Sequence, residues 1–325
     1  MNKTTMKAAV YYRYGGPEVV KVQEIPLPVP AENEVLIQVK CSGVNRTDTG
    51  FRSAEYFISR FWSGLFKPKY PVLGCQYAGV VTACGANVKE FKPGDRVFGF
   101  DDAHFGANAE YVCKPEKGAI AHIPAEIDFE TAAMLTEGAN YALCNIRAAK
   151  VQAGQRILVN GGTGAIGSAA IQLLKHFGAY VVAVCATAHL DKVKLLGADE
   201  VIDYTQEDFT QSDQSFDFVF DAVGKSTFGK CRRILKAKGV YISTELGPGI
   251  QNPWLALFTP LAGGKRLLFP IPTFPKEDLN FLASLALEGK FKPLLDRTYQ
   301  LQEIAEAHHY VQQGFKIGNV LITMN

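Results

Sequence analysis

A glycine-rich segment carries the clearest chemical signal in the chain. Gly162, Gly164 and Gly167 follow the pattern G-x-G-x-x-G, an apolar run of strand composition precedes them, and a run with helical spacing follows. In that setting the first glycine permits a tight turn, the second lets the backbone approach a pyrophosphate, and the third lets helix and strand pack closely. Free N–H groups at the helix start favour phosphate. We therefore expect a dinucleotide, with S-adenosylmethionine or a purely structural turn as alternatives; the expected contacts are Gly162, Thr163, Gly164, Ala165, Ile166 and Gly167.

The end of the next strand indicates which dinucleotide binds. Proteins that bind NAD usually place Asp or Glu there, about 20 residues past the glycines, to hold the ribose 2′-OH. Here that position holds Cys185, and Asp191 falls in the following helix, where a capping role is expected. With no carboxylate to repel a 2′-phosphate, we expect NADP(H), with Thr187, His189 and Lys192 as donors and positive charge. For Lys192 an ordinary solvated lysine is an equal alternative.

Strands and helices alternate around this motif. Such alternation implies right-handed crossovers and a doubly wound parallel sheet. The expected strands are 156–159, 181–185, 201–203, 216–221 and 240–243, and the expected helices are 129–150, 164–177, 190–196 and 227–235.

The first 125 residues have a different texture, with short β-branched and aromatic runs separated by Gly and Pro. This pattern predicts a compact, barrel-like β unit. The expected strands are 7–12, 19–23, 34–41, 77–82, 96–100, 110–113 and 119–123. The tail, with expected helices near 278–288 and 301–311 and a strand at 319–323, is too short for a third domain and is expected to pack on one of the first two.

Composition fits this two-domain interpretation. The chain has 325 residues, 47% of them apolar, and a net charge of +2, so nothing indicates a strong attraction to nucleic acid or acidic membranes. No apolar run reaches the roughly 18–20 residues of a membrane span, and the N-terminus lacks a signal-peptide pattern. The seven cysteines are scattered and form no C-x-x-C pair. We expect free thiols in a reducing cytoplasm.

Taken together, these segments resemble the medium-chain dehydrogenase/reductase superfamily, in particular its zinc-free, NADPH-dependent quinone oxidoreductase family. The resemblance rests on VLIQVKCSGVNRTD at 35–48, YPVLGCQYAGVVTA at 70–83, FKPGDRVF at 91–98, the stretch 151–204 and residues 318–323. It implies an α/β fold in which a Rossmann domain (125–265) is inserted into a GroES-like β-barrel catalytic domain made of 1–124 and 266–325. It also implies a nicotinamide in the cleft between the domains and a homodimer.

The chain departs from the zinc-dependent relatives of this family. Those carry Cys in a Gly-Val-Cys-His-Thr-Asp stretch and a later Gly-His-Glu, where this chain has Asn45 and Cys75-Gln76. Amides are poor zinc ligands, so we expect no metal; a residual zinc site through Cys41, Cys75 or His104 is the alternative. Without a Lewis acid, hydride transfer suits an acceptor that is already electrophilic, such as a quinone or an α,β-unsaturated carbonyl.

The resemblance also suggests catalytic residues. The Asn matching Asn45 lies near nicotinamide and acceptor, although an Asx turn would also explain this residue. Asp48 keeps an acidic family position, with a helix cap as an equal alternative, and Tyr56 is a candidate wall or donor of the acceptor pocket, with packing as the alternative. Asn140 falls where relatives have a Thr that contacts the nicotinamide. Glu137 is an unexpected charge that could be a surface cap, a proton relay or a sign of a different cleft.

Further cofactor contacts follow from position in the expected fold. Tyr204 matches a family Tyr near the adenosine ribose, Ser243 follows the fifth Rossmann strand, and Phe269 and Ile271 border the carboxamide. Residues 51–70, unusually aromatic, form either a lid or an amphipathic surface helix. We expect an NADPH-dependent, zinc-independent reductase of quinones or activated alkenes that works by positioning, without a dedicated acid. The alternatives are an enoyl-thioester or enone reductase, or a low-turnover NADPH-binding sensor.

Overall fold

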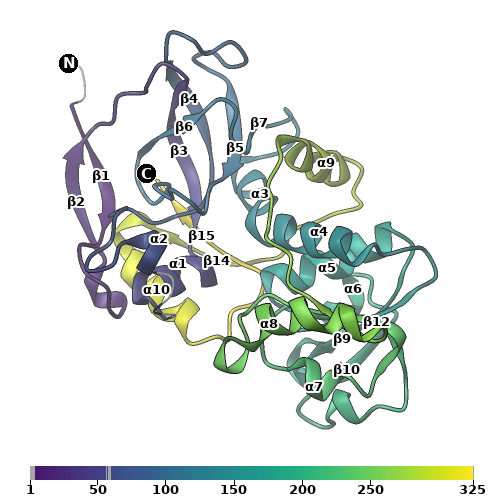
Figure 1. The fold of residues 1–325 in the computed structure, drawn as a ribbon. Coiled ribbons are helices and arrows are strands. Elements are labelled where there is room, and N and C mark those ends of the chain that lie inside the picture. The colour runs from purple at the N-terminus through teal and green to yellow at the C-terminus, as the bar shows by residue number, and fades with distance from the viewer. Residues whose placement is uncertain (1–3, 56, 58–59, 325) are drawn as a thin grey trace. The chain divides into compact units, whose positions relative to one another are not determined.

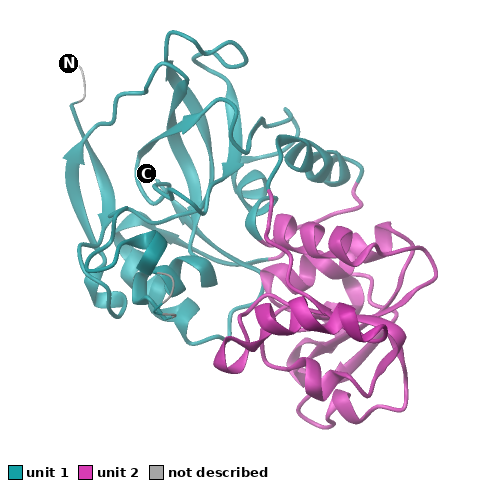
Figure 2. Cartoon of the chain, viewed as in Figure 1, with its two compact units in different colours: residues 1–137, 274–288, 295–325 teal, residues 138–273, 289–294 magenta. Residues whose placement is uncertain are grey.

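The protein forms two compact units (Figure 2). The structure is a computed structural model that describes residues 4–55, 57 and 60–324. One unit comprises residues 1–137, 274–288 and 295–325, and the other comprises 138–273 and 289–294. Compact units and domains need not end at the same residue, so the domain limits 1–124, 125–265 and 266–325 stay a prediction.

A six-stranded parallel sheet forms the centre of the second unit (Figure 1). Across the sheet the strands are β10 (Glu200–Asp203), β9 (Tyr180–Cys185), β8 (Arg156–Asn160), β11 (Phe216–Asp221), β12 (Leu235–Ser243) and β13 (Arg266–Leu268). Numbered along the chain from β8, this order is 3-2-1-4-5-6, which is that of a dinucleotide-binding doubly wound sheet. The predicted α/β fold with a doubly wound parallel sheet is confirmed.

Burial of the central strands explains their composition. Ile157, Leu158 and Val159 of β8 are all 0% exposed, as are Val181 and Val182 of β9. A strand covered on both faces by helices needs apolar side chains at every position rather than at alternate ones. The helices of this part of the chain are α4 (Glu137–Ala149), α5 (Ala165–His176), α6 (Leu190–Leu195), α7 (Phe228–Cys231) and α8 (Gln251–Phe258).

The first unit is built on a seven-stranded sheet. Its order is β14 (Leu295–Gln300), β15 (Asn319–Thr323), β3 (Glu34–Gly43), β4 (Gln76–Cys84), β5 (Arg96–Phe100) and β7 (Ile120–His122), with β6 (Tyr111–Pro115) paired to β3. Strands β1 (Thr5–Val10) and β2 (Lys21–Pro26) form a separate antiparallel pair. Because β15 pairs with β3, with Leu321 opposite Gly43, the end of the chain completes this sheet.

Helices of the first unit lie beside this sheet. They are α1 (Arg46–Ser53), α2 (Arg60–Ser63), α3 (Phe129–Met134), α9 (Lys276–Leu287) and α10 (Ile304–Gln312). Short 3-10 turns occur along the chain at Pro17–Val19, Thr187–His189, Phe209–Gln211, Pro248–Ile250, Thr259–Ala262 and Leu301–Glu303. Among the described residues, no helix combines the length and the apolar character that crossing a membrane requires.

Two predicted helices differ from the structure. The segment 129–150 is two helices, because the Thr136 hydroxyl donates to the Ala133 carbonyl at 2.6 Å and competes with the helical bonds. The break makes Glu137 the first residue of a new helix. The helix expected at 227–235 is only the single turn α7, since Leu235 already belongs to β12.

Candidate functional site

The glycine motif forms the turn between β8 and α5, in the second unit. Gly164 is the N-cap of α5 and has an extended backbone. A Cβ placed on Gly164 would meet nothing nearer than the Gly161 oxygen at 3.6 Å, whereas one on Gly167 would lie only 2.0 Å from that oxygen. Gly167 thus packs the helix against the turn, and Gly164 keeps open the approach to the helix N-terminus. This arrangement fits a pyrophosphate.

The strained position of this turn differs from the expected one. Gly161, at φ 85°, adopts the left-handed conformation, while the backbone of Gly162 is not left-handed. A Cβ on Gly162 would instead lie 3.2 Å from the Ile171 side chain. The assignment of the tight turn to Gly162 is therefore wrong, and Gly161 performs that role.

The end of β9 has an acidic neighbour that the sequence analysis missed. Cys185 ends β9 and is 1% exposed, and it lies opposite Asp203, the last residue of β10. The Asp203 carboxylate accepts hydrogen bonds from the hydroxyls of Thr187 and Thr205. The bond from Thr187 helps hold the pKa of Asp203 below its usual value, so a negative charge stands beside Thr187. The parallel pairing of β10 with β9 brings Asp203 beside Cys185. The residues of β9 alone do not predict this contact.

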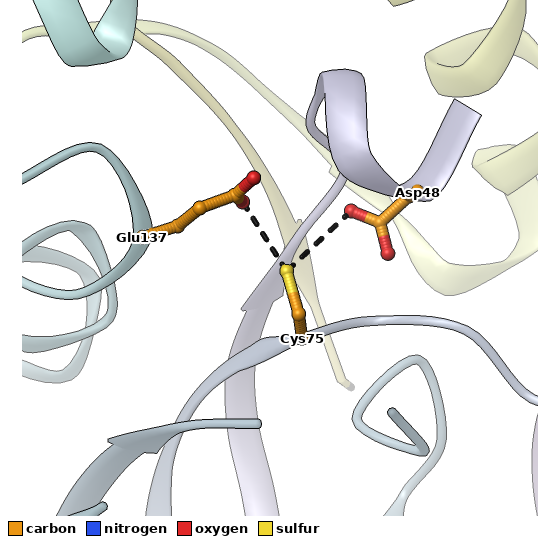
Figure 3. A group of neighbouring side chains, drawn as sticks. All are labelled: Asp48, Cys75 and Glu137. Carbon is orange, nitrogen blue, oxygen red and sulfur yellow. Dashed lines mark hydrogen bonds between the residues drawn. The ribbon is translucent and has the colours of Figure 1, made fainter. Parts of the chain in front are cut away.

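A buried polar cluster lies in the first unit, around the start of α1. Asp48, Cys75 and Glu137 come from three separate segments and are 0%, 0% and 4% exposed. Figure 3 shows both carboxyl groups directed toward the Cys75 sulfur. The sulfur lies 3.2 Å from Glu137 Oε2 and 4.0 Å from Asp48 Oδ2, so the thiol donates mainly to Glu137.

The two carboxyl groups of this cluster differ in the kind of hydrogen-bond donor that they accept from. Both oxygens of Asp48 accept backbone N–H groups, from Asn45 at 2.9 Å and from Gly74 at 2.8 Å. Asp48 at N3 therefore accepts from the backbone N–H of the N-cap residue Asn45, which is one half of a capping box and the cap role left open above. Glu137 instead accepts from side chains, namely the Thr47 hydroxyl at 2.6 Å and the Asn45 amide at 2.5 Å.

Burial sets the electrostatics of the cluster. It raises the pKa of Asp48, the neighbouring Glu137 charge raises it further, and the N–H groups of Asn45 and Gly74 partly offset both. Burial likewise raises the pKa of Glu137, against the hydrogen bonds from Thr47 and Cys75. Two buried carboxyl groups this close cannot both ionise readily, so the pair favours a state with one shared proton.

Comparisons with known proteins match the chain from end to end. Family models match residues 31–125, described as an alcohol dehydrogenase GroES-like domain, and residues 196–322, described as a zinc-binding dehydrogenase. The chain is 33% identical to a 2-methylene-furan-3-one reductase of Solanum lycopersicum, over 98% of this chain and 79% of that protein. It is 29% identical to the quinone oxidoreductase of Homo sapiens, over 95% of this chain and 94% of that one. This chain belongs to the quinone oxidoreductase family of the medium-chain dehydrogenases/reductases.

Solved structures of this family share the fold. The quinone oxidoreductase of Coxiella burnetii superimposes with a TM-score of 0.90 at 28% identity, covering 99% of this chain and 100% of that one. The Escherichia coli quinone oxidoreductase, whose structure contains NADPH, gives 0.83 at 26%, covering 98% and 99%. The suspected family and the combination of a GroES-like domain with a doubly wound sheet are both confirmed.

Zinc is the metal that this cluster would be expected to hold, since a zinc-binding dehydrogenase model matches the chain. Asp48, Cys75 and Glu137 offer three potential ligand atoms within 4.8 Å of one another. Every carboxylate oxygen, however, already accepts a hydrogen bond from the protein, and Asn45 points its N–H₂ group, a donor, at Glu137. Ligands of zinc must instead present lone pairs to one point. The residues present therefore do not fit a zinc ion.

Two predicted site residues carry polar atoms without a partner. Asn140 is 1% exposed, and neither atom of its amide has a hydrogen-bond partner among the described residues. The same holds for Asn45 Oδ1 and for Nε2 of its neighbour Gln76. A buried amide without partners is costly, which makes Asn140 and Asn45 well suited to bind a group that the protein itself does not supply.

The other predicted residues are scattered over the second unit, apart from Tyr56, which lies outside the described residues. Tyr204 is 58% and Ile271 85% exposed, and Ser243, at the end of β12, is buried. His189 and Lys192 lie at and just after the start of α6, and Phe269 follows β13. Each assignment stays a prediction. Sequence analysis named Glu137 but missed Thr47, which donates to Glu137, and Gln76, which accepts from Asn45; neither carries a motif of its own.

Proposed function

We propose that the protein is an NADPH-dependent reductase that transfers hydride to a quinone or an α,β-unsaturated carbonyl without a metal ion. The supporting observation is the open approach at Gly164 on the N-terminus of α5, within a doubly wound sheet of a quinone oxidoreductase family member. When bound, the dinucleotide would supply the hydride. The chain's part is to hold the pyrophosphate at residues 162–167 and to contact the nicotinamide with the unpartnered amide of Asn140. Asn45, whose Oδ1 also lacks a partner, keeps its predicted role as a separate contact of the first unit.

The choice of NADP(H) over NAD(H) is supported by the missing carboxylate at Cys185 and by relatives whose names specify NADPH. One of these is the NADPH-dependent alkenal/one oxidoreductase of Arabidopsis thaliana, 32% identical over 98% of this chain. Asp203 argues in the other direction, but its carboxylate already accepts from Thr187 and Thr205. We therefore assign the 2′-phosphate to Thr187, His189 and Lys192.

The acceptor is narrowed by the relatives to two chemical classes. Some are named as quinone oxidoreductases and others as enone or alkenal reductases. Loss of dihydronicotinamide absorbance should be followed with ortho- and para-quinones, enones and enoyl thioesters. Turnover with NADPH in at least one class, and weaker binding of NADH, would support the proposal. Tight NADPH binding with no turnover in any class would refute it and favour a sensor.

We further propose a homodimer formed through the second unit. Strand β13 is an edge strand of the parallel sheet. Several apolar side chains in helix α8, and in the turn that follows it, are exposed. Trp254, Leu257 and Leu261 are 63%, 61% and 81% exposed, which is unusual for isolated surface residues of this size. Light scattering should give twice the chain mass, and L257D should give a monomer; a monomeric wild type would contradict the proposal.

We also propose a reducing compartment, the cytoplasm, as its location. All seven cysteines are free, and four of them, Cys41, Cys75, Cys185 and Cys231, are buried. Some relatives are described as chloroplastic or mitochondrial, so fractionation of the source cells is the test. Recovery with an organelle marker would contradict the cytoplasmic assignment.

A further inference from the structure

Glu137 has no role in a reductase that works by positioning alone. A carboxyl group that is 4% exposed costs considerable free energy unless its surroundings are built for it. Here they are, since a hydroxyl, an amide and a thiol all donate to its two oxygens. Such a complete set of donors indicates a group that is held in place for use.

The protonated member of the carboxyl pair can be identified from its partners. Asp48 accepts two backbone N–H groups, which cannot turn away and which bind a carboxylate more strongly than a neutral acid, so protonating Asp48 would weaken both bonds. Glu137 accepts only from side chains, and the hydroxyl of Thr47 can rotate to accept a bond from a protonated carboxyl group. The proton that the pair holds therefore resides on Glu137.

The two oxygens of Glu137 have different partners, which lets the cluster accommodate both protonation states. With Glu137 ionised, the Asn45 amide donates to Glu137 at 2.5 Å and to Gln76 at 2.9 Å, which leaves Asn45 Oδ1 and Gln76 Nε2 without partners. When Glu137 is protonated on Oε1, its O–H donates to the Thr47 hydroxyl, and the Asn45 amide keeps its bond to Oε2. The same side chains thus form hydrogen bonds to either state of the acid.

Thr47 connects this acid to the outside of the cluster. Its side chain is only partly buried, unlike those of Asn45, Asp48 and Cys75, and its hydroxyl lies 2.6 Å from Glu137 Oε1. A hydroxyl both donates and accepts, so it can take a proton from Glu137 while giving its own to a bound oxygen. Thr47 is the only one of these groups that combines contact with Glu137 and partial exposure.

The charged groups that face Glu137 have opposed effects on its protonation. Asp48 from α1 favours the neutral acid, and Lys316 from the loop before β15 favours the carboxylate. The Cys75 thiol, whose pKa is raised well above its usual value by burial and by Asp48 and Glu137, stays neutral. Asp102 adds a further negative charge near Cys75. Opposed influences of this kind keep both states of Glu137 accessible.

We propose that Glu137 stores the proton that the reduced acceptor requires and delivers it through the Thr47 hydroxyl. This inference rests on the proposed function. In the reduction of an enone, the hydride brings two electrons to the β-carbon, and the C=C pair shifts toward the carbonyl. The carbonyl oxygen takes the Thr47 proton, and Thr47 takes that of Glu137, whose O–H bond breaks. The nicotinamide is oxidised, Glu137 becomes a carboxylate that water reprotonates through Thr47, and the enol tautomerises in solution.

The test compares two acceptors in wild type, E137Q and T47V. An enone is a weak hydride acceptor, so its reduction depends on an acid that neutralises the developing enolate oxygen, whereas a quinone is a stronger oxidant and accepts the hydride without one. We expect enone kcat to fall about 100-fold or more in both variants, the usual scale of general acid catalysis, and quinone kcat to fall less than about threefold. Wild-type enone kcat should decrease as pH rises, since the acid must be protonated, and E137Q should lose this decrease.

Matched variants separate proton delivery from structural damage. T47S keeps the hydroxyl and should restore most of the enone activity, and E130Q, which removes an exposed carboxylate of α3, should behave as wild type. NADPH affinity should be unchanged in all four variants. Equal losses for quinone and enone, or an unaltered pH profile in E137Q, would overturn the inference. Failure of the wild type to reduce either acceptor would instead refute the proposed function.

Discussion

Alanine substitutions at two glycines of the cofactor turn, Gly164 and Gly167, should have separate effects, one on NADPH affinity and the other on stability. A Cβ on Gly167 would lie 2.0 Å from the Gly161 oxygen, well over 1 Å inside a normal contact of about 3.4 Å, and neither the Cβ nor this backbone oxygen can move without the main chain. The start of α5 must therefore move in G167A, at a cost of about 2 kcal/mol, which lowers Tm by about 4–8 °C. A Cβ on Gly164 has 3.6 Å of clearance, so G164A should change stability by less than about 1 kcal/mol.

The same two variants should rank in the opposite order for NADPH. The added methyl of G164A stands at the helix N-terminus, where the phosphates would bind, so we expect Kd to rise at least about tenfold, equivalent to about 1.4 kcal/mol. Calorimetry gives both quantities, as thermal unfolding and as titration with NADPH. G164A that binds NADPH like wild type, or G167A that unfolds at the wild-type temperature, would refute the assignment of roles.

Three further outcomes follow from the structure. Because the pKa values of Asp48 and Glu137 are raised, their contribution to the free energy of unfolding is fully present below the usual carboxyl pKa and is lost as pH rises through the folded-state pKa values. Chemical denaturation should therefore show the stability of E137Q increasing relative to wild type as pH rises. Parallel stability curves for the two proteins would contradict this. Dialysis against a chelator should change neither Tm nor activity, and stoichiometric zinc in the purified protein would overturn the metal-free proposal. K192A should weaken NADPH binding several-fold and leave NADH binding unchanged, while K194A on the same helix serves as its control; equal effects of K192A on both dinucleotides would remove Lys192 from the 2′-phosphate site.

The parallel sheet could be predicted because local signals agree there. Strands β8 and β9 contain continuous apolar runs, β11 is rich in Phe, and the glycine motif marks the turn after β8. Strand β13 is three residues long, and β14 is largely exposed, so neither carries a strong apolar pattern. Their places are set by pairing with β12 and β15, which is a long-range effect that a local pattern does not encode.

The cluster around Glu137 could be predicted only in part. Glu137 was noticed because a charge in an apolar stretch is unusual, but its partners come from α1 and from the loop before β4, 90 and 62 residues away. Their hydrogen bonds depend on the tertiary fold. The same is true of Asp203, which is brought beside Cys185 by the pairing of β10 with β9. Residue types gave the chemistry of the site, and only the fold shows which of them meet.

The most direct test of the account follows the hydride itself. NADPH carrying deuterium at the transferred position of its nicotinamide should be incubated with the wild-type protein and an enone, and the product analysed by mass spectrometry and NMR. The account predicts one deuterium, bound to the β-carbon, and an exchangeable proton from water on the α-carbon. Reduced product without deuterium at carbon, or no product from any enone or quinone while NADPH binds, would contradict it.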